Sequence, residues 1–235
     1  MTREYQINEW QKEESWRMFR IIGEFVEGFD RLNNIGPAVS VYGSARIKPE
    51  DELYKQTVEI TRRLGELGFA VITGGGPGVM EAANRGAQEA GVTSVGLNIE
   101  LPEAQVCNAY TTKNISFKHF FVRKVMLVKY ATAFIIMPGG LGTMDELTEV
   151  LTLIQTHMIK PFPVILFSSK YWKGFLDWLR VNVLSEGMIT EQDFNLLRIC
   201  DKPEDVAEIV QRWYIRQEIV GKQALGGLPG QISPG

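Results

Sequence analysis

A glycine-rich segment near the middle of the chain combines features that bind anions with a side chain that can act as an acid. Residues 138–146 read PGGLGTMDE and directly follow the apolar run Thr132–Met137. Glycine has no Cβ to hold a ligand away from the backbone, and the free amides at a helix start favour an anion such as phosphate. Glu146 follows Thr143 by about one helical turn, so its carboxylate can reach past a phosphate to the rest of a ligand. The segment predicts a phosphate cradle with a catalytic acid beside it.

The same residues also have purely structural explanations. Glycine turns between a strand and a helix are common in α/β proteins, and an Asp–Glu pair in a first helical turn complements the helix dipole. The segment is not a Walker A loop, because no Gly-Lys-Ser/Thr follows it, and it lacks the Gly-x-Gly-x-x-Gly pattern. The first predicted strand ends in residues 42–46, YGSAR, which lack that pattern too. An NAD-binding oxidoreductase is therefore a poor fit.

A second loop of the same kind occurs earlier in the chain. The apolar run Phe69–Thr73 leads into residues 74–81, GGGPGVME. Pro77 suits the first position of a helix, where its missing N–H costs nothing, and Glu81 falls in the first turns of that helix. Because ligands of open parallel sheets bind at the carboxyl ends of the strands, we expect both loops to face one crevice.

One hydroxyl and two cations complete the candidate residues. Ser44 follows a strand and a glycine, where it can bind phosphate or ribose or simply cap the turn. Arg123 and Lys124 begin a predicted helix, where positive charge opposes the helix dipole. A locally unfavourable placement often marks a functional position, and arginine can grip a phosphate or carboxylate with two parallel bonds. The alternative is a surface charge pair.

Strands and helices alternate from Ala38 onward, which is the pattern of an α/β protein. The strands are continuously apolar, as expected for a parallel sheet covered on both faces, and right-handed crossovers then give a Rossmann-like doubly wound sheet. Predicted strands lie near residues 38–42, 69–73, 93–98, 115–119, 132–137, 163–167 and, more weakly, 196–200. Predicted helices lie near residues 51–67, 77–90, 120–131, 142–157, 171–185 and 203–218.

The segments that flank this pattern suggest three divisions of the chain. Residues 1–36 form a helical extension, in which apolar residues recur at three- and four-residue spacing over 3–34. This amphipathic helix packs on its own domain or contacts a second copy, since its polar face carries too many Glu residues for a membrane surface. Residues 37–220 form the catalytic domain, and residues 221–235 a flexible tail. Within the domain, Glu100–Asn114 is either a lid or a plain connection.

Composition narrows the function classes. A chain of 235 residues fits one α/β domain or two small ones, and its net charge of −3 gives no support for nucleic-acid binding. No stretch approaches the roughly 20 apolar residues of a membrane span, and the first residues lack the apolar core of a secretion signal. Cys107 and Cys200 are isolated, which fits a reducing cytosol. We therefore expect a cytoplasmic protein. His119 and His157 are the only histidines, so a histidine-rich metal site or a Ser-His-Asp triad is not expected, and we predict no metal or cofactor.

Three of these motifs together resemble the LONELY GUY (LOG) family of cytokinin riboside 5′-monophosphate phosphoribohydrolases. They are residues 74–81, the Arg123–Lys124 pair and residues 138–146. The family signature PGGxGTxxE is present without a departure, and the separation of Arg123 from Glu146 is similar to the family's arginine-to-glutamate spacing. The resemblance covers roughly residues 38–216. The N-terminal helix and the segment after Pro163 go beyond the compact family core and resemble its longer bacterial branch.

The resemblance implies cleavage of the N-glycosidic bond of an adenosine 5′-monophosphate, plain or N6-modified, to free base and ribose 5-phosphate. Arg123 and Glu146 would be the catalytic pair, and self-association to a homodimer or a larger homo-oligomer is implied too. Many such proteins are labelled possible lysine decarboxylases, but we find no convincing context for a Schiff-base lysine. The predicted substrate-binding residues are Ser44, Gly75, Gly76, Glu81, Lys124, Gly139, Gly140, Gly142, Thr143, Asp145 and Thr152. Residues that line a base pocket or belong to plain core are Phe117, Phe120, Met126 and Met158.

Two other functions remain open beside a cytokinin-activating enzyme. An AMP nucleosidase without a cytokinin role differs from it in the room left around N6 of the base. A non-catalytic carrier of a nucleotide or of the molybdenum cofactor needs the phosphate loops but not the Arg123–Glu146 pair, because fold alone does not fix function. The presence of both residues favours the enzyme.

Overall fold

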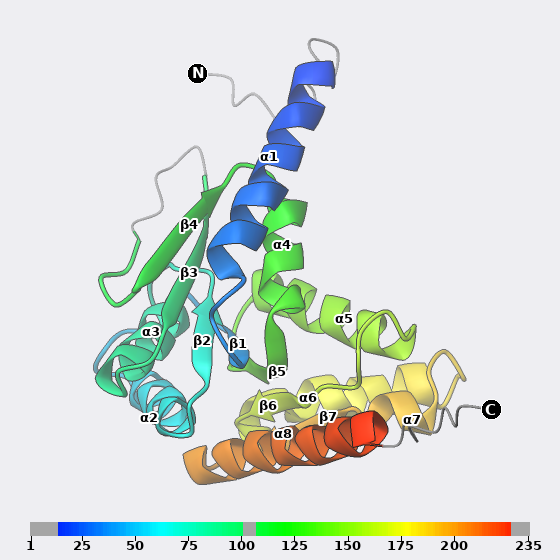
Figure 1. Ribbon diagram of the computed structural model, residues 1–235. Coiled ribbons are helices and arrows are strands. Elements are labelled where there is room, and N and C mark those ends of the chain that lie inside the picture. The colour runs from blue at the N-terminus through cyan, green and yellow to red at the C-terminus, as the bar shows by residue number, and fades with distance from the viewer. Residues whose placement is uncertain (1–13, 101–106, 227–235) are drawn as a thin grey trace, which may run out of the picture.

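The computed structural model describes residues 14–100 and 107–226 and contains a seven-stranded, fully parallel sheet (Figure 1). The strands lie in the order β4-β3-β2-β1-β5-β6-β7. Almost every residue of the central strands is buried, as expected when helices cover both faces of a parallel sheet. The strands are β1 Ala38–Tyr42, β2 Ala70–Thr73, β3 Ser94–Ile99, β4 Lys113–Phe117, β5 Ala131–Ile136, β6 Val164–Phe167 and β7 Leu197–Cys200.

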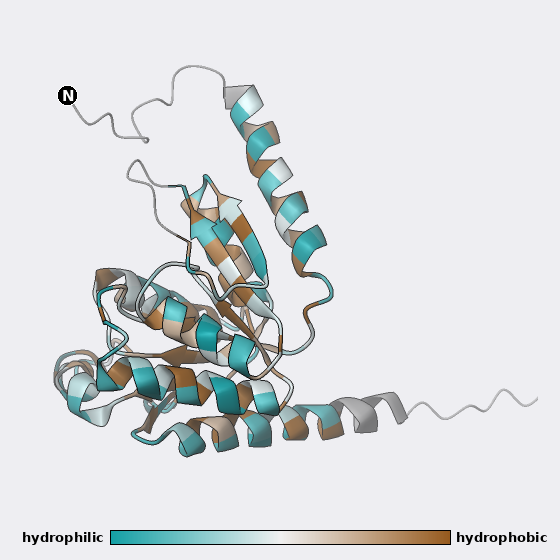
Figure 2. Cartoon of the chain, turned by 90° about the vertical axis from the view of Figure 1, so that its left-hand side faces the viewer, coloured by the Kyte–Doolittle hydropathy of each residue, from teal (hydrophilic) through white to brown (hydrophobic). Residues whose placement is uncertain are grey.

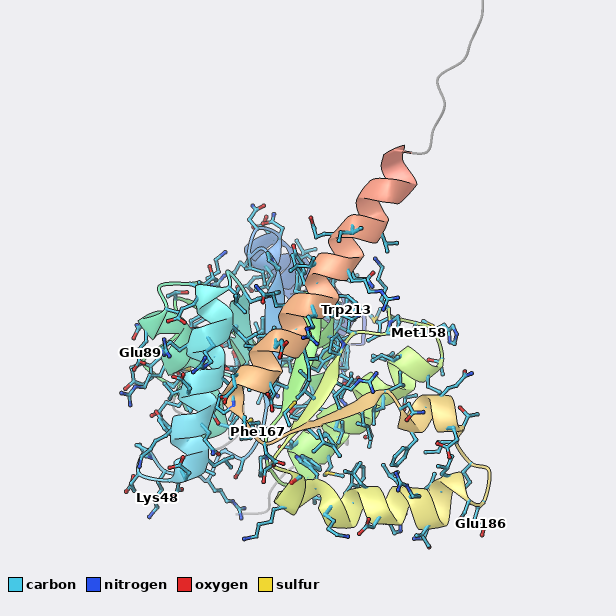
Figure 3. All side chains as sticks on the ribbon, turned by 90° about the horizontal axis from the view of Figure 1, so that it is seen from below. Lys48, Glu89, Met158, Phe167, Glu186 and Trp213 are labelled. Atoms are coloured by element: carbon cyan, nitrogen blue, oxygen red, sulfur yellow. The ribbon has the colours of Figure 1, made fainter. Side chains whose placement is uncertain are left out.

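Helices cover the two faces of the sheet and form two separate apolar cores. The helices are α1 Glu14–Leu32, α2 Glu52–Glu66, α3 Val79–Glu89, α4 Phe120–Lys129, α5 Leu141–Gln155, α6 Ser169–Trp178, α7 Glu191–Phe194 and α8 Pro203–Gly226. One core joins the sheet to α4, α5 and α6 through Val122, Met126, Leu147, Val150 and Trp172. The other joins it to α2, α3 and α8 through Ile60, Leu64, Val79, Ala83, Val206 and Val210. Figure 3 shows α8 beside α2, with Trp213 reaching from α8.

The order of the strands reverses between β1 and β5, at the centre of the sheet. From β1 the chain builds outward through β2, β3 and β4, and then returns to place β5 on the other side of β1. The ends of these two strands are bonded to each other, since Met137 N donates to Tyr42 O (2.8 Å) and Ser44 N donates to Pro138 O (3.0 Å). In open α/β sheets, ligands bind in the crevice at such a reversal.

The structure confirms the α/β Rossmann-like prediction and places a strand at each of the seven expected positions. The predicted helix at 171–185 differs, because α6 continues at Leu179–Leu184 as a π-helix. Helix α7 was not predicted, because its four residues are too few to show a periodicity. Its available signal is the capping box, in which Thr190 accepts from Asp193 N while Asp193 accepts from Thr190 N.

The flanking segments lie partly outside the described residues. Helix α1 begins at Glu14, so residues 3–13 of the predicted N-terminal helix are not described. Helix α8 extends beyond residue 220 to Gly226, which places the start of the predicted tail in a helix, and residues 227–235 are not described. Residues 101–106 of the predicted lid or connection are likewise outside, and Lys113 and Asn114 already belong to β4. Among the described helices, none is long and apolar enough to cross a membrane.

Helix α1 is attached to the body mainly through α4. Its inner side chains Ile21 and Phe25 pack against the core, and the Glu24 carboxylate accepts from the backbone N–H groups of Lys118 and His119 (3.1 and 3.2 Å), where α4 starts. Apolar and polar residues alternate along α1, whose N-terminal end extends beyond the sheet (Figures 1 and 2). Glu24 thus anchors the two residues that directly precede the helix carrying Arg123.

Candidate functional site

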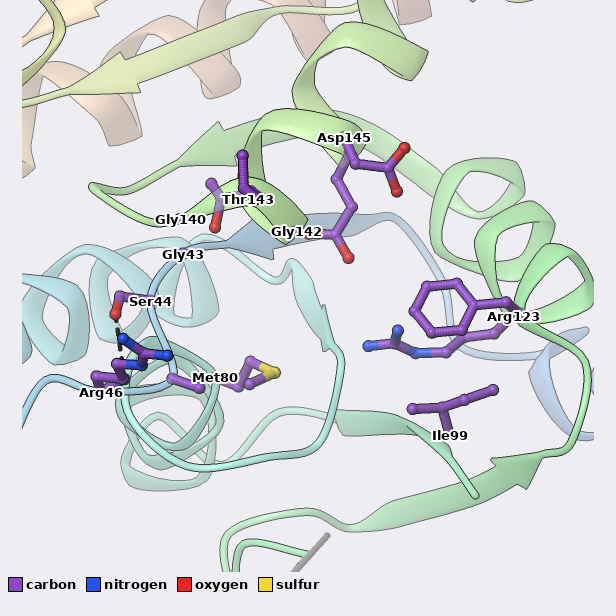
Figure 4. Close-up of a pocket in the computed structure, with 14 residues that line it drawn as sticks. Gly43, Ser44, Arg46, Met80, Ile99, Arg123, Gly140, Gly142, Thr143 and Asp145 are labelled. Atoms are coloured by element: carbon purple, nitrogen blue, oxygen red, sulfur yellow. Dashed lines mark hydrogen bonds between the residues drawn. The ribbon is translucent and has the colours of Figure 1, made fainter. Parts of the chain in front are cut away.

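A cavity of about 700 Å³ lies at the carboxyl ends of β1 and β5 (Figure 4). The loop after β1 forms one side of it, the glycine turn and first turns of α5 form the second, and α4 contributes the third. The lining residues are Gly43, Ser44, Ala45, Arg46, Met80, Ile99, Phe120, Arg123, Gly140, Leu141, Gly142, Thr143, Asp145 and Glu146. The fold therefore gathers residues from five segments of the chain at the strand-order reversal.

Arg123 reaches the cavity from the first turns of α4. Its side chain is 7% exposed, and its Nε donates to the carbonyl oxygen of Leu97 at 2.7 Å. The guanidinium carbon lies 5.6 Å from the ring centroid of Phe120. Burial lowers the pKa of the guanidinium, and the charge of Glu146 opposes that change. Because arginine stays charged even so, Arg123 brings a poorly solvated positive charge to the cavity wall.

Glu146 enters the cavity from the second turn of α5. Within the described residues its carboxylate accepts no hydrogen bond and forms no ion pair. Burial raises the pKa of Glu146 to about 7, and the nearby Arg123 charge limits that rise. A carboxyl group that titrates near neutral pH can both take up and release a proton, which suits a general acid–base catalyst.

The start of α5 offers free backbone amides to the cavity. Gly140 occupies the N-cap position without a side-chain bond, and the first turn contains no acidic residue. Apart from the adjoining backbone, no atom of the described residues lies within 4 Å of the position that a Cβ would take at Gly140 or Gly142. The Thr143 hydroxyl faces the same turn and has no hydrogen-bond partner among the described residues. Unneutralised amides with open space in front of them suit an anion.

Other glycines of the two loops make room for the protein itself. A Cβ at Gly74 would collide with the Arg123 guanidinium, and one at Gly75, where φ is +72°, would collide with the Asn98 side chain. A Cβ at Gly139 would collide with Thr143. The expectation that glycines admit a ligand thus fits the space at Gly140 and Gly142, whereas internal packing explains Gly74, Gly75 and Gly139.

The structure brings part of the predicted set together. The seven predicted residues that line the cavity are Ser44, Arg123, Gly140, Gly142, Thr143, Asp145 and Glu146. Six others lie outside its lining: Gly75, Gly76, Glu81, Lys124, Gly139 and Thr152.

Each of these six has a different environment. The carbonyl groups of Gly75 and Gly76 accept bonds from Asn108 (2.9 and 3.0 Å), and Glu81 accepts one from the Tyr54 hydroxyl (2.9 Å). Lys124 pairs with two carboxylates, from Asp145 (3.0 Å) and Glu149 (3.2 Å). The Gly139 carbonyl accepts from the Tyr171 hydroxyl (2.5 Å), and Thr152 is exposed on α5.

Several lining residues were absent from the predicted set. Arg46 follows Ser44 in the same loop, so its position after a strand was an available signal. Met80 and Ile99 are apolar and carried no sequence signal. Of the four residues with an open base-pocket or core role, Phe120 lines the cavity, Phe117 and Met126 are buried in the core, and Met158 is exposed. In the described part of the chain, no group of three or more His, Cys, Asp and Glu side chains is arranged to hold a metal.

Comparison with known proteins gives a family and a fold. A family model described as possible lysine decarboxylase matches residues 80–210, more than half of the chain. The cytokinin riboside 5′-monophosphate phosphoribohydrolase LOG of Oryza sativa subsp. japonica is 30% identical over 139 residues, which cover 57% of this chain and 56% of that protein. The cytokinin riboside 5′-monophosphate phosphoribohydrolase of Rhodococcoides fascians is 31% identical over 78 residues, 33% of this chain and 39% of that protein. The chain thus matches about half or less of the length of these two relatives.

A solved structure extends the comparison over three quarters of the chain. The molybdenum cofactor binding protein from the phototrophic bacterium Rippkaea orientalis has a TM-score of 0.55 and 23% identity, covering 75% of this chain and 96% of that one. At this identity the likeness establishes a shared fold.

Proposed function

Since this chain belongs to the LOG-type family, whose model is described as possible lysine decarboxylase, we propose that it hydrolyses the N-glycosidic bond of an adenosine 5′-monophosphate. The observation that carries the proposal is the cavity in which Arg123 and Glu146 meet the free amides of α5. A phosphate-binding helix start, a buried cation and a carboxyl group with a pKa of about 7 supply what this reaction needs. Two relatives named phosphoribohydrolases support the same assignment.

The proposed reaction replaces the base by water at C1′ of the ribose. The bond between C1′ and the base nitrogen breaks, and the base keeps the electron pair while positive charge develops on the sugar. The oxygen of water bonds to C1′, one proton passes from water to Glu146, and that proton leaves with the base. The products are the free base and ribose 5-phosphate. Water supplies all the atoms that are added, so the balance needs no other reactant.

The residues of the cavity divide this work between them. The Glu146 carboxylate stabilises the positive charge on the sugar and orients the attacking water. The phosphate binds at Gly140, Gly142 and Thr143, where backbone amides and a hydroxyl have no partner among the described residues. Arg123 lies near enough to Glu146 to limit the rise in its pKa, and so keeps a fraction of the carboxylate ionised at neutral pH.

The cavity suits this hydrolysis better than amino-acid decarboxylation. A pyridoxal-dependent decarboxylase forms a Schiff base through a lysine amine. The described residues that line the cavity include no lysine. The adjacent Lys124 is held between Asp145 and Glu149. The two ion pairs favour its protonated form, which is not nucleophilic.

The test is to incubate purified protein with AMP and with N6-isopentenyl-AMP and to follow the release of free base by chromatography. Glu146→Gln keeps the shape of the side chain but cannot accept the proton, so it serves as the control. Release by the wild type alone supports the glycosidase, and the ratio of the two rates separates a cytokinin-activating enzyme from an AMP nucleosidase. Binding of AMP without release would instead indicate a nucleotide carrier.

We further propose that two copies of the chain associate through α1 and α4. The outer faces of these helices expose Trp16, Phe19, Val26, Phe120 and Phe121 to solvent, and Phe120 also lines the cavity. Arg20 lies in the N-terminal half of α1 and Asp30 near its C-terminal end. A two-fold axis that crosses α1 near residue 25 and pairs the helix with itself antiparallel would place Arg20 of each copy opposite Asp30 of the other, a reciprocal contact of the kind that two-fold interfaces make.

A further inference from the structure

We infer that Arg46 binds the phosphate group of the nucleotide, which fixes the phosphate at one end of the cavity and leaves Arg123 at the other end with the ribose and base. The inference rests on the proposed function and deepens it. Arg46 lines the cavity but belongs to none of the motifs of the glycine turn. Three observations support it: the rigidity of its loop, the lack of a carboxylate partner for its guanidinium among the described residues, and the arrangement of charges around the cavity.

The loop that carries Arg46 is held from several directions. Arg46 N donates to Ser44 Oγ (3.1 Å), which closes the turn after β1 (Figure 4). Ser44 N donates to Pro138 O (3.0 Å), so the loop is bonded directly to the glycine turn after β5. Val79 N donates to Ser44 O (2.9 Å) at the start of α3. A side chain on such a loop starts from a fixed position relative to α5, so less freedom is lost when it binds a ligand.

The Arg46 guanidinium has no carboxylate partner within the described residues. Many other cationic side chains of the protein form an ion pair with a carboxylate, including Arg62 with Glu59 and Arg85 with Glu89. Lys124, beside the cavity, is engaged by two carboxylates. Arg46 is exposed, so it keeps its charge and its donors for a ligand. Arginine suits phosphate because its planar donors can form two parallel bonds to the oxygen atoms.

The charges around the cavity set the direction of the ligand. In Figure 4, Ser44 and Arg46 lie on one side together with Gly140 and Thr143, and the Arg123 guanidinium enters from the opposite side. The carboxylates of Asp145 and Glu146 stand further along α5 than the free amides. They repel a phosphate from the Arg123 end, whereas Arg46 and the amides attract it to the other. Arg123 then faces the part of the substrate where the bond breaks, next to the ring of Phe120.

The test compares ligands with and without a phosphate. Binding of ribose 5-phosphate, AMP and adenosine is measured by calorimetry on the Glu146→Gln protein, so that turnover does not interfere. Arg46→Gln in that background is expected to weaken the binding of ribose 5-phosphate and of AMP by about 10- to 100-fold. The affinity for adenosine should stay unchanged. Arg46→Lys keeps the charge and recovers part of the loss. In the otherwise wild-type enzyme, Arg46→Gln raises KM much more than it lowers kcat.

The matched control is Lys48→Gln, which removes an exposed cation two positions further along the same loop, outside the cavity lining. It should bind all three ligands as its parent does. Unchanged binding of ribose 5-phosphate to Arg46→Gln would overturn the inference, and so would an equal loss for adenosine. If the wild type binds ribose 5-phosphate through Arg46 but releases no base, the inference stands while the proposed hydrolysis fails. If the wild type hydrolyses AMP and Arg46→Gln has the same KM for it, the proposed hydrolysis stands while the inference about Arg46 fails.

Discussion

The guanidinium of Arg123 occupies the space in front of Gly74 where any other residue would place its Cβ. The two residues come from different layers of the fold, since Gly74 directly follows β2 and Arg123 belongs to α4. Together with the bond from Arg123 Nε to Leu97 O (2.7 Å), this contact fixes where the guanidinium sits. The glycine loop after β2 therefore acts on the cavity through Arg123.

Replacing Gly74 by alanine should disable the site while the protein remains folded. The added methyl group meets the Arg123 guanidinium and the Met80 sulfur, which are ends of flexible side chains that can move. We expect kcat/KM for AMP to fall by about 100-fold, because small displacements of a catalytic group have effects of that size. Circular dichroism and urea unfolding check the fold. Gly23→Ala is the matched control, since Gly23 has nothing within 4 Å and should keep full activity.

Glu146→Gln should stabilise the protein, and more so at alkaline pH. Burial raises the pKa of Glu146 from 4.5 to about 7, so the folded protein holds this proton more tightly than the unfolded chain does. The free energy of unfolding therefore falls as the pH rises through that interval. Glutamine never ionises, so the variant should gain about 1–3 kcal/mol over the wild type at pH 8 and much less at pH 4. Urea unfolding of the variant and the wild type at both pH values measures the gain in the free energy of unfolding. An equal gain at pH 4 and pH 8 would contradict the raised pKa of Glu146.

The rate of hydrolysis should rise with pH up to about 7, because the ionised form of Glu146 accepts the proton from water. Below that pH, kcat/KM is expected to increase by about tenfold per unit, as for a single ionisation. AMP binding is measured at each pH, so that titration of the substrate phosphate is separated from that of Glu146. A rate that falls over the same range would mean that the protonated carboxyl group is the active form.

Asn84 should be among the side chains whose loss destabilises the fold. It is fully buried in α3, accepts from the Thr73 hydroxyl (2.6 Å) and Asn108 Nδ2 (3.0 Å), and donates to Ser94 Oγ (2.9 Å). Asn84→Ala removes all three bonds and opens a polar gap, although Asn108 Nδ2 still donates to Gly76 O. The loss should lower the free energy of unfolding by about 2–4 kcal/mol. Gln88→Ala, an exposed change in the same helix, should stay within about 0.5 kcal/mol.

Phe19→Glu should separate the proposed dimer. Phe19 is 66% exposed on α1, and a charge buried there against a second copy costs several kcal/mol. Light scattering after size exclusion should show the mass of one chain. Lys170→Glu also introduces a glutamate, on the exposed surface of α6 away from α1, and should keep the mass of two chains. Arg20→Glu should weaken the association, and Arg20→Glu with Asp30→Arg should restore it. A wild type that is monomeric at high concentration would refute the proposal.

The sequence was sufficient to predict the layers of the fold but only part of the cavity. Each strand is a short apolar run between turn residues, and that signal is local. The cavity depends on which strand ends become neighbours, and this was predictable for Ser44 and Thr143 because they follow β1 and β5 at the reversal. Met80 and Ile99 line the cavity with apolar side chains that look like core residues in sequence.

The role of each glycine also depends on packing between distant segments. Gly74 and Gly140 occupy equivalent places after two strands, yet one accommodates Arg123 and the other faces open space. A glycine in a motif indicates only that a side chain is absent. Which atoms, if any, occupy the space beside it depends on how distant segments pack. The ion pairs of Lys124 with Asp145 and Glu149 join two helices, so they too were beyond the reach of local patterns.

The carboxylate of Glu24 links the N-terminal extension to the cavity through α4. It accepts hydrogen bonds from the backbone N–H groups of Lys118 and His119, and Arg123 follows about one turn later in α4. A chain shortened to begin at residue 37 would lose the anchor of that helix, although every residue that lines the cavity would still be present. The boundary near residue 36 therefore divides the sequence only. The residues that hold α4, and with it Arg123, in place lie on both sides of that boundary.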